Sequence, residues 1–291
     1  HPGFFYHSQI IPCMTLSSAV IESILQAVYE SGEAIMEVQS RIGGVEASLK
    51  ADNSPVTEAD IAAHRIINKV LEPTGFPVLS EEGHHPDFAN RKDWETLWVV
   101  DPLDGTKEFI KGRNEYTVNI GLVHQGIPIF GVVYAPALGW VYLGGSDIPA
   151  MKSNAPISYK DMLTQAMRMP GRHPDKLTVV ASRSHMSEAT EALLAGWEVA
   201  HGPIERVSMG SSLKICLVAE GRAHAYPRAA PTMEWDTAAG HAVATAAGCN
   251  VFRIDHLDGK ITWSEPLAYN KENLLNPHFL ICGADYLCGH A

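Results

Sequence analysis

The stretch "VVDPLDGTKEF", residues 99–109, constrains the fold most, because an apolar run ends directly in two aspartates. The run before Asp101 predicts a buried strand, and Pro102 and Gly105 predict a turn that fixes the backbone around Asp101 and Asp104. Removing two neighbouring carboxylates from water is unfavourable unless a cation joins them. The stretch therefore predicts a strand end that carries a metal site.

Simpler interpretations of this stretch exist. Asp-Pro and Asp-Gly are common turn dipeptides, so each aspartate taken alone has a plain turn as its alternative. A turn explains the pair less well, because turns rarely hold two aspartates against a buried run. An EF-hand calcium loop does not fit, because Leu103 and Gly105 interrupt the alternating oxygen-bearing positions that such a loop needs.

Further acidic residues stand where other regular segments end or turn. Asp60 lies in "SPVTEAD", Glu81 and Glu82 lie in "LSEEG", and Asp236 lies in "EWDTAAG". Strand-end carboxylates with a backbone carbonyl such as that of Leu103 make an all-oxygen site, which suits Mg²⁺ or Mn²⁺ rather than Zn²⁺. Such a set can also hold two ions for phosphoryl displacement. A helix cap is the alternative for Asp236.

The composition is that of a globular protein and limits the possible partners. The chain has 291 residues, 46% of them hydrophobic, and a formal net charge of −11, which argues against a nucleic-acid or anionic-membrane binder. A small phosphate ligand remains compatible, because metals and a few bases can reverse the field in one cleft. No apolar run approaches the roughly 18 residues of a membrane span. The five cysteines form no CxxC pair, so neither a zinc site nor a disulfide framework is expected.

The first half of the chain predicts two helices followed by an antiparallel meander. Apolar spacing predicts a helix within residues 15–38, and Ser54-Pro55 predicts the start of a second helix. β-rich runs follow, with turns at Gln125-Gly126 and at 136–139. Residues 145–176 are polar and aperiodic, which predicts a surface excursion and a domain boundary.

The second half alternates between strand and helix patterns, which predicts a layered α/β arrangement. Residues 1–13 lack the features of a signal peptide and are expected to be an artificial extension or an N-terminal arm. The domains expected are residues 14–150, an α+β unit with most of the metal ligands, and residues 151–291, an α/β unit with Asp236 and the residues that bind substrate.

Two motifs resemble those of the inositol monophosphatase superfamily. Its members are magnesium-dependent, lithium-sensitive phosphatases. "DPLDGT" matches the DP-[ILM]-DGT motif, and "EWDTAAG" is similar to WD-x-[AG]-[AG]-G. Longer stretches, including "VVDPLDGTKEFIKGRNEYTVNIGLV" and "GSSLKICLVAEG", resemble bacterial 3′(2′),5′-bisphosphate nucleotidases. The resemblance covers nearly all of the chain from Met14 and implies a five-layered α-β-α-β-α sandwich.

The resemblance also implies residue roles. The side chains of Glu81, Asp101, Asp104 and Asp236 and the carbonyl of Leu103 would bind two or three Mg²⁺ ions, with Mn²⁺ as a substitute. Asp60 would hold a further, weaker ion. Thr106 and Glu81 would orient the attacking water, so the expected catalytic residues are Glu81, Thr106 and Asp60.

Hydroxyl and basic residues in the second half predict how a phosphate ester is bound. Ser211 and Lys214 in "MGSSLKICLVAEG" lie where a strand gives way to a helix, and Arg228 follows in "YPRAAP". Their alternatives are a helix cap for Ser211, a solvated surface lysine for Lys214, and a loop histidine for His185 in "SRSH". The resemblance implies the following substrate-binding residues: Gly105, Thr106, His185, Ser211, Lys214, Arg228 and Asp236.

The expected function is hydrolysis of adenosine 3′,5′-bisphosphate, and of its sulfated form, to release phosphate. An inositol mono- or polyphosphate phosphatase is the alternative enzyme, although the "SSLK" lysine is typically absent from simple inositol monophosphatases. A catalytically silent metal or ligand sensor is the non-enzymatic alternative, which the intact carboxylate set disfavours. A cytoplasmic location is expected, and the resemblance alone adds the cytoplasmic face of the inner membrane as an alternative. The net charge predicts no nucleic-acid partner, and a homodimer is left open.

Overall fold

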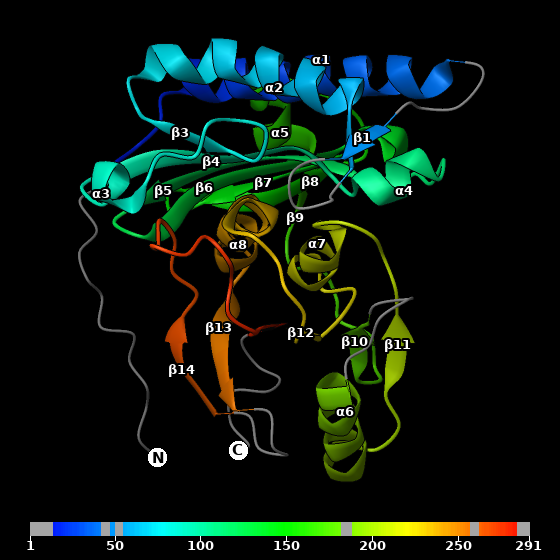
Figure 1. Cartoon of the computed structure of the whole chain (residues 1–291). Coiled ribbons are helices and arrows are strands. Elements are labelled where there is room, and N and C mark those ends of the chain that lie inside the picture. The colour runs from blue at the N-terminus through cyan, green and yellow to red at the C-terminus, as the bar shows by residue number, and fades with distance from the viewer. Residues whose placement is uncertain (1–13, 42–46, 50–54, 182–187, 257–261, 284–291) are drawn as a thin grey trace.

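The computed structural model describes residues 14–41, 47–49, 55–181, 188–256 and 262–283. Its elements form five layers, in the order helix, sheet, helix, sheet, helix (Figure 1). This arrangement confirms the predicted layered fold. None of the helices in these ranges is long and apolar enough to cross a membrane.

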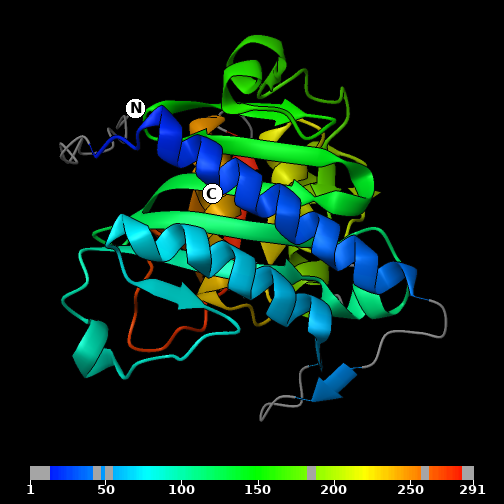
Figure 2. The ribbon, with the colours of Figure 1, turned by 90° about the horizontal axis from the view of Figure 1, so that it is seen from above.

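The outer layer consists of two long helices that lie side by side across one face of the first sheet (Figure 2). They are α1 (Ser18–Ser40) and α2 (Glu58–Leu71). Ile24, Leu25 and Ile67 are fully buried against that sheet, and the apolar spacing of the sequence predicted the first of them. The helix expected to open at Pro55 begins later, at Glu58. Pro55 instead belongs to β2 (Pro55–Thr57), and Thr57 and Asp60 form the capping box that starts α2.

The first sheet has seven strands, antiparallel except for the parallel pair β3 and β4. A register shift between Asp101 and Asp104 interrupts the pairing of β4 with β5. In spatial order, the strands are β3 (Val78–Ser80), β4 (Thr96–Asp104), β5 (Thr117–His124), β6 (Ile127–Ala135), β7 (Trp140–Gly145), β8 (Ile148–Ser153) and β9 (Met167–Arg168).

The structure differs from the prediction at residues 145–176, which were expected to form a surface excursion. Ile148–Ser153 forms the mostly buried strand β8, because its apolar side chains continue the core of the first sheet. The same sheet extends to β9, so the chain passes to the second sheet between Arg168 and Thr178. The division into domains at residue 150 remains a prediction, and β8 spans that position.

The second sheet has six strands. On one side of the sheet, β10 pairs in parallel with both β11 and β12, and the pairs β12–β15, β15–β13 and β13–β14 are antiparallel. In spatial order, its strands are β11 (Glu205–Val207), β10 (Thr178–Val180), β12 (Ala225–Arg228), β15 (Phe279–Gly283), β13 (Cys249–His256) and β14 (Thr262–Pro266). Helix α6 (Glu188–His201) covers its outer face, where Leu193 and Leu194 are buried.

Helices α7 (Leu213–Ala219) and α8 (Ala238–Ala246) fill the layer between the two sheets. Helix α8 approaches the first sheet closely at Gly131, where an added Cβ would lie 2.1 Å from the carbonyl oxygen of Ala239. Gly121 allows the same approach one strand away. This close approach places the start of α8, and the neighbouring residue Asp236, beside the end of β4.

The remaining elements are short connections. The two-stranded sheet of β1 (Ala47–Leu49) and β2 (Pro55–Thr57) precedes α2. The short helices are α3 (Phe88–Arg91), α4 (Thr106–Ile110) and α5 (Tyr159–Gln165), and the 3₁₀ turns are η1 (Glu72–Thr74), η2 (Pro136–Leu138) and η3 (Glu234–Asp236).

Candidate active site

The end of β4 turns sharply around its two aspartates. Asp101 is buried, and its Oδ1 accepts the backbone N–H of Leu103 at 3.0 Å, which holds the turn. Gly105 has a φ of +91°, in the left-handed region that favours glycine, and α4 starts immediately afterwards. The local sequence therefore fixes both carboxylates at one end of the sheet.

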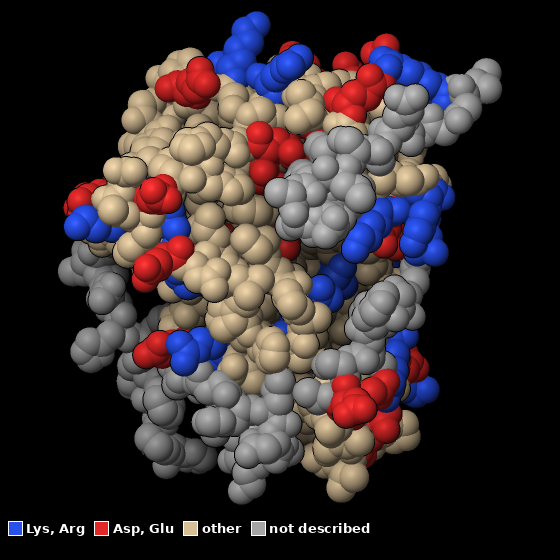
Figure 3. All heavy atoms as spheres, in the orientation of Figure 1, with Lys and Arg blue, Asp and Glu red and all other residues tan. Residues whose placement is uncertain are grey.

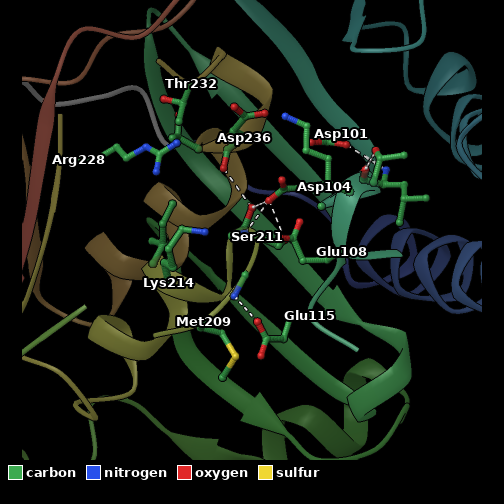
Figure 4. A pocket seen from close by; sticks show the side chains of 18 of the residues that line it. Asp101, Asp104, Glu108, Glu115, Met209, Ser211, Lys214, Arg228, Thr232 and Asp236 are labelled. Carbon is green, nitrogen blue, oxygen red and sulfur yellow. Dashed lines mark hydrogen bonds between the residues drawn. The ribbon is translucent and has the colours of Figure 1, made fainter. Parts of the chain in front are cut away.

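Three carboxylates from two distant parts of the chain meet at this end of the sheet. One oxygen from each of Asp101, Asp104 and Asp236 lies within 4.8 Å of the others. Asp236 comes from η3, where its Oδ2 accepts the N–H of Met233 at 2.7 Å. The helix-cap alternative for Asp236 holds for η3, whose first N–H its carboxylate accepts, but not for α8, whose N-cap is Thr237. The cluster joins the end of the first sheet to the start of the central helix (Figure 4).

The electrostatics of this cluster favour a cation. Burial, and then the neighbouring charge of Glu81, raises the pKa of Asp101 well above its usual range. Burial, and then Asp104, raises the pKa of Asp236 to about 8. Like charges held this closely are stable together only when protons or a cation compensate them. Three hard carboxylate oxygens are a donor set that fits Mg²⁺ or Mn²⁺.

Glu81 and Leu103 line the same cavity as the three aspartates. Glu81 directly follows β3, and its backbone N–H donates to Val100 of the neighbouring strand at 3.0 Å. The carbonyl of Leu103 accepts the hydroxyl of Thr106 at 3.1 Å. The parallel pairing of β3 with β4 thus brings an acidic turn to the strand end where Asp101 lies.

Thr106 and Asp60 form a second part of the site. The Thr106 hydroxyl lies 3.3 Å from Asp60 Oδ1, and Asp60 Oδ2 accepts both the N–H and the hydroxyl of Thr57, at 2.7 and 2.6 Å. Asp60 is buried, so these contacts replace water around its carboxylate. Thr57 was not among the predicted residues, although the spacing Thr57 to Asp60 is that of a capping box.

The loop before α7 supplies contacts that the sequence did not predict. Ser211 Oγ donates to Asp104 Oδ2 at 2.7 Å, and Ser212 donates to the same oxygen through both its N–H and its hydroxyl at 2.6 Å. The helix-cap alternative for Ser211 is wrong, because Ser212 is the N-cap and its side chain makes no cap bond. The sequence placed Ser212 beside Ser211 at the junction of strand and helix, but it did not predict the contact of Ser212 with Asp104.

These residues line a cavity of about 510 Å³ between the two halves. Lys214 and Arg228 extend into it from the wall formed by α7 and β12 (Figure 4). Burial lowers the pKa of Lys214, and the charge of Asp104 opposes that shift. The surface-lysine alternative for Lys214 is wrong, because the side chain is largely enclosed.

The residues at the rim of the cavity near α4 were also not predicted from the sequence. The rim carries the exposed cations Lys107, Lys111 and Arg113, and the partly buried Glu108 and Glu115. The space-filling view shows basic side chains gathered on this side of the molecule (Figure 3). Their proximity to "DPLDGT" in the sequence was the available signal. The predicted substrate residue His185 lies outside the described residues.

Comparison with known proteins connects this site to a family. The family model of the inositol monophosphatase family matches residues 17–280. The 3′(2′),5′-bisphosphate nucleotidase CysQ of Escherichia coli (strain K12) is 43% identical over 267 residues, which cover 90% of this chain and 99% of that protein. CysQ of Salmonella typhimurium is 44% identical over 265 residues, with the same shares covered.

A solved structure shows the same relationship. The crystal structure of CysQ from Bacteroides thetaiotaomicron, described as a bacterial member of the inositol monophosphatase family, superposes with a TM-score of 0.80. It is 45% identical in sequence and covers 92% of this chain and 97% of its own. The sequence match, the five-layered fold and the carboxylate cluster agree, and the chain belongs to the inositol monophosphatase family.

Proposed function

We propose that this protein is a magnesium-dependent 3′(2′),5′-bisphosphate nucleotidase. It hydrolyses adenosine 3′,5′-bisphosphate to AMP and phosphate, and 3′-phosphoadenylyl sulfate to adenylyl sulfate and phosphate. The observation that carries this proposal is the meeting of Asp101, Asp104 and Asp236 in a cavity that also holds Lys214 and Arg228. This chain covers 99% of the length of two relatives that are named as such nucleotidases.

The carboxylates fit Mg²⁺, with Mn²⁺ as a substitute. The ligands proposed for two or three ions are Glu81, Asp101, Asp104, Asp236 and the carbonyl of Leu103. Their fit rests on the burial and mutual repulsion that raise the pKa of Asp101 and Asp236. When bound, the ions supply a water of lowered pKa and stabilise the charge that develops on the phosphoryl group.

Thr106 and Asp60 are proposed to accept the proton of the attacking water. The Thr106 hydroxyl has one proton, which it directs toward Asp60 Oδ1 or the Leu103 carbonyl. Its lone pairs can therefore accept a proton from water while its own proton moves toward Asp60. Thr57 occupies the other Asp60 oxygen and keeps Oδ1 turned toward Thr106. Glu81, which lines the same cavity, is proposed to orient the same water.

The far end of the substrate is proposed to meet the wall formed by α7 and β12. Lys214 and Arg228 come from that wall and are the cations that a second phosphate or sulfated phosphate requires (Figure 4). Gly105 and Thr106 line the same cavity and are proposed to lie beside the reacting phosphate. His185 stays a proposed adenosine contact by resemblance, as does Ser211, whose hydroxyl is directed to Asp104.

A substrate panel with the purified protein tests this proposal. Phosphate release is measured with Mg²⁺ for adenosine 3′,5′-bisphosphate, 3′-phosphoadenylyl sulfate, inositol 1-phosphate and an inositol polyphosphate. We expect the two nucleotides to give the highest kcat/KM. A higher value for an inositol phosphate would establish the alternative enzyme, and no release from any of them would favour the metal or ligand sensor.

A further inference from the structure

One oxygen of Asp104 receives all of the hydrogen bonds that the loop before α7 makes to that carboxylate. Ser211 Oγ, Ser212 N and Ser212 Oγ lie 2.7, 2.6 and 2.6 Å from Oδ2 (Figure 4). Within the described ranges of the chain, no residue donates to Oδ1. The contacts cross from the second half of the chain to a strand end in the first half, and they leave Oδ1 as the oxygen available to a cation.

The hydroxyl of Ser211 is oriented by a chain of buried polar groups on β5. Asn119 Nδ2 donates to Thr117 Oγ1 at 3.2 Å, and Thr117 Oγ1 lies 2.5 Å from Ser211 Oγ. Because the Asp104 carboxylate accepts the one proton of the Ser211 hydroxyl, Thr117 is the donor in its bond with Ser211, while its oxygen accepts from the Asn119 amide. All three residues are buried, so water does not compete for these bonds.

The backbone of the loop is held in an uncommon conformation. Ser211 has a φ of +54°, which is unfavourable for a residue with a side chain. On the other side, Glu115 Oε2 accepts the N–H of Gly210 at 2.8 Å, and a Cβ on Gly210 would lie 2.7 Å from the Glu115 carbonyl oxygen. Residues such as Ser211 persist in this region when their surroundings fix them, and they concentrate at functional sites.

We propose that Ser212, together with Ser211, is a positioning residue that sets the orientation of Asp104 for metal binding. Ser212 also lies 3.1 Å from the carbonyl oxygen of Asp236, so its hydroxyl stands between two of the proposed ligands. Partners that orient a metal-binding carboxylate typically change metal affinity by 10–100-fold when they are removed. The Mg²⁺ affinity of the carboxylate site at the end of β4 therefore depends on the loop before α7.

Magnesium binding to the metal-free full-length protein tests this inference. The variants Ser212→Ala and Ser211→Ala are titrated with Mg²⁺ alone by isothermal calorimetry, after treatment with a chelator. We expect each to bind Mg²⁺ roughly 10–100-fold more weakly than the unchanged protein. In activity assays, the Mg²⁺ concentration for half-maximal rate should rise by a similar factor in both variants. The KM for substrate at saturating Mg²⁺ should change much less in Ser212→Ala, because Ser212 is not among the proposed substrate contacts.

Ser31→Ala is the matched control, because Ser31 is a fully buried serine of α1. Among the described residues, its hydroxyl forms one hydrogen bond, to the Ala63 carbonyl at 3.5 Å. The substitution removes the same atom from another part of the core and should leave Mg²⁺ affinity unchanged. Equal losses in all three variants, or unchanged Mg²⁺ affinity in Ser212→Ala and Ser211→Ala, would overturn the inference. A raised substrate KM with unchanged Mg²⁺ affinity would instead make the serines substrate contacts.

The inference rests on the metal-dependent site of the proposed function, and the two can fail separately. An unchanged protein that binds Mg²⁺ but releases no phosphate from the bisphosphate would contradict the proposed nucleotidase alone. An unchanged protein that binds no Mg²⁺ would contradict both. Because calorimetry needs no substrate, the role of Ser212 is measured independently of which phosphate ester the enzyme hydrolyses.

Discussion

Lys152 and Glu220 form an ion pair inside the protein, with Nζ and Oε2 2.8 Å apart and with 7% and 3% of their side chains exposed. The pair joins β8 of the first sheet to the residue that ends α7. Tyr142 donates its hydroxyl to the other Glu220 oxygen, and Lys152 Nζ lies 4.1 Å from the centroid of the Trp140 ring. The glutamate is therefore satisfied only while its partners are present.

Removal of one member of this pair should destabilise the protein strongly. Lys152→Met leaves Glu220 buried without its cation, and such losses cost about 3–5 kcal/mol of the free energy of unfolding. Urea denaturation of the single variants and of Lys152→Met/Glu220→Gln gives the coupling energy. We expect the double variant to lose less than the sum of the single variants, and simple additivity would show that the two charges are independent.

Asp101→Asn should nearly abolish turnover and leave the fold intact. The amide keeps the shape of the side chain and can still accept the N–H of Leu103, but it removes the most buried charge of the cluster. Loss of an orienting partner already costs 10–100-fold, so loss of a direct ligand should lower kcat/KM by at least roughly a hundredfold. Asp93→Asn, at an exposed position, is the control. Near-normal activity at saturating Mg²⁺ would remove Asp101 from the site.

The stability of the metal-free protein should fall as the pH rises. Burial and Asp104 raise the pKa of Asp236 to about 8, above its value near 4 in the unfolded chain, so the folded state binds the proton more tightly. The resulting stabilisation is complete below about pH 4 and is lost as the pH rises to about 8. Burial and Glu81 shift Asp101 in the same direction.

Thermal unfolding with a chelator, measured between pH 5 and 8, checks this dependence. We expect Tm to decrease across the range, to decrease less in Asp236→Asn, and to become nearly independent of pH when Mg²⁺ is added. A Tm that rises with pH in the chelated protein would show that the carboxylates do not repel one another as the structure indicates.

Lys214→Ala should change substrate selectivity more than catalysis. A charged hydrogen bond to phosphate contributes about 1.5–3 kcal/mol, so kcat/KM for adenosine 3′,5′-bisphosphate should fall by roughly ten- to a hundredfold. Inositol 1-phosphate lacks the second group, and its hydrolysis should change much less. Lys176→Ala, whose lysine pairs with Glu205 at the surface, is the control. Equal losses for both substrates would assign Lys214 to the catalytic centre or to the fold.

The sequence by itself determined the local features of this protein. Apolar spacing predicted the long helices, and the apolar run before "DPLDGT" predicted the strand that ends at Asp101 and Asp104. These features depend on neighbouring residues, so periodicity and turn residues reveal them. The residues at which helices and strands begin were predicted less accurately. Pro55 suits both the first turn of a helix and an extended strand, and only the capping box of Thr57 decided between them.

Only the tertiary structure decided how the distant parts of the site meet. Asp236 joins the strand-end aspartates because the glycines of β5 and β6 admit the backbone of α8, an approach that no local pattern encodes. Ser212 faces Asp104 across 108 positions of sequence, and the local pattern "GSSLK" does not encode that contact. Strand β8 was missed for the same reason, since its side chains are buried by partners that lie far away in the chain. Local patterns fix the elements, whereas packing between the layers selects which side chains share one cavity.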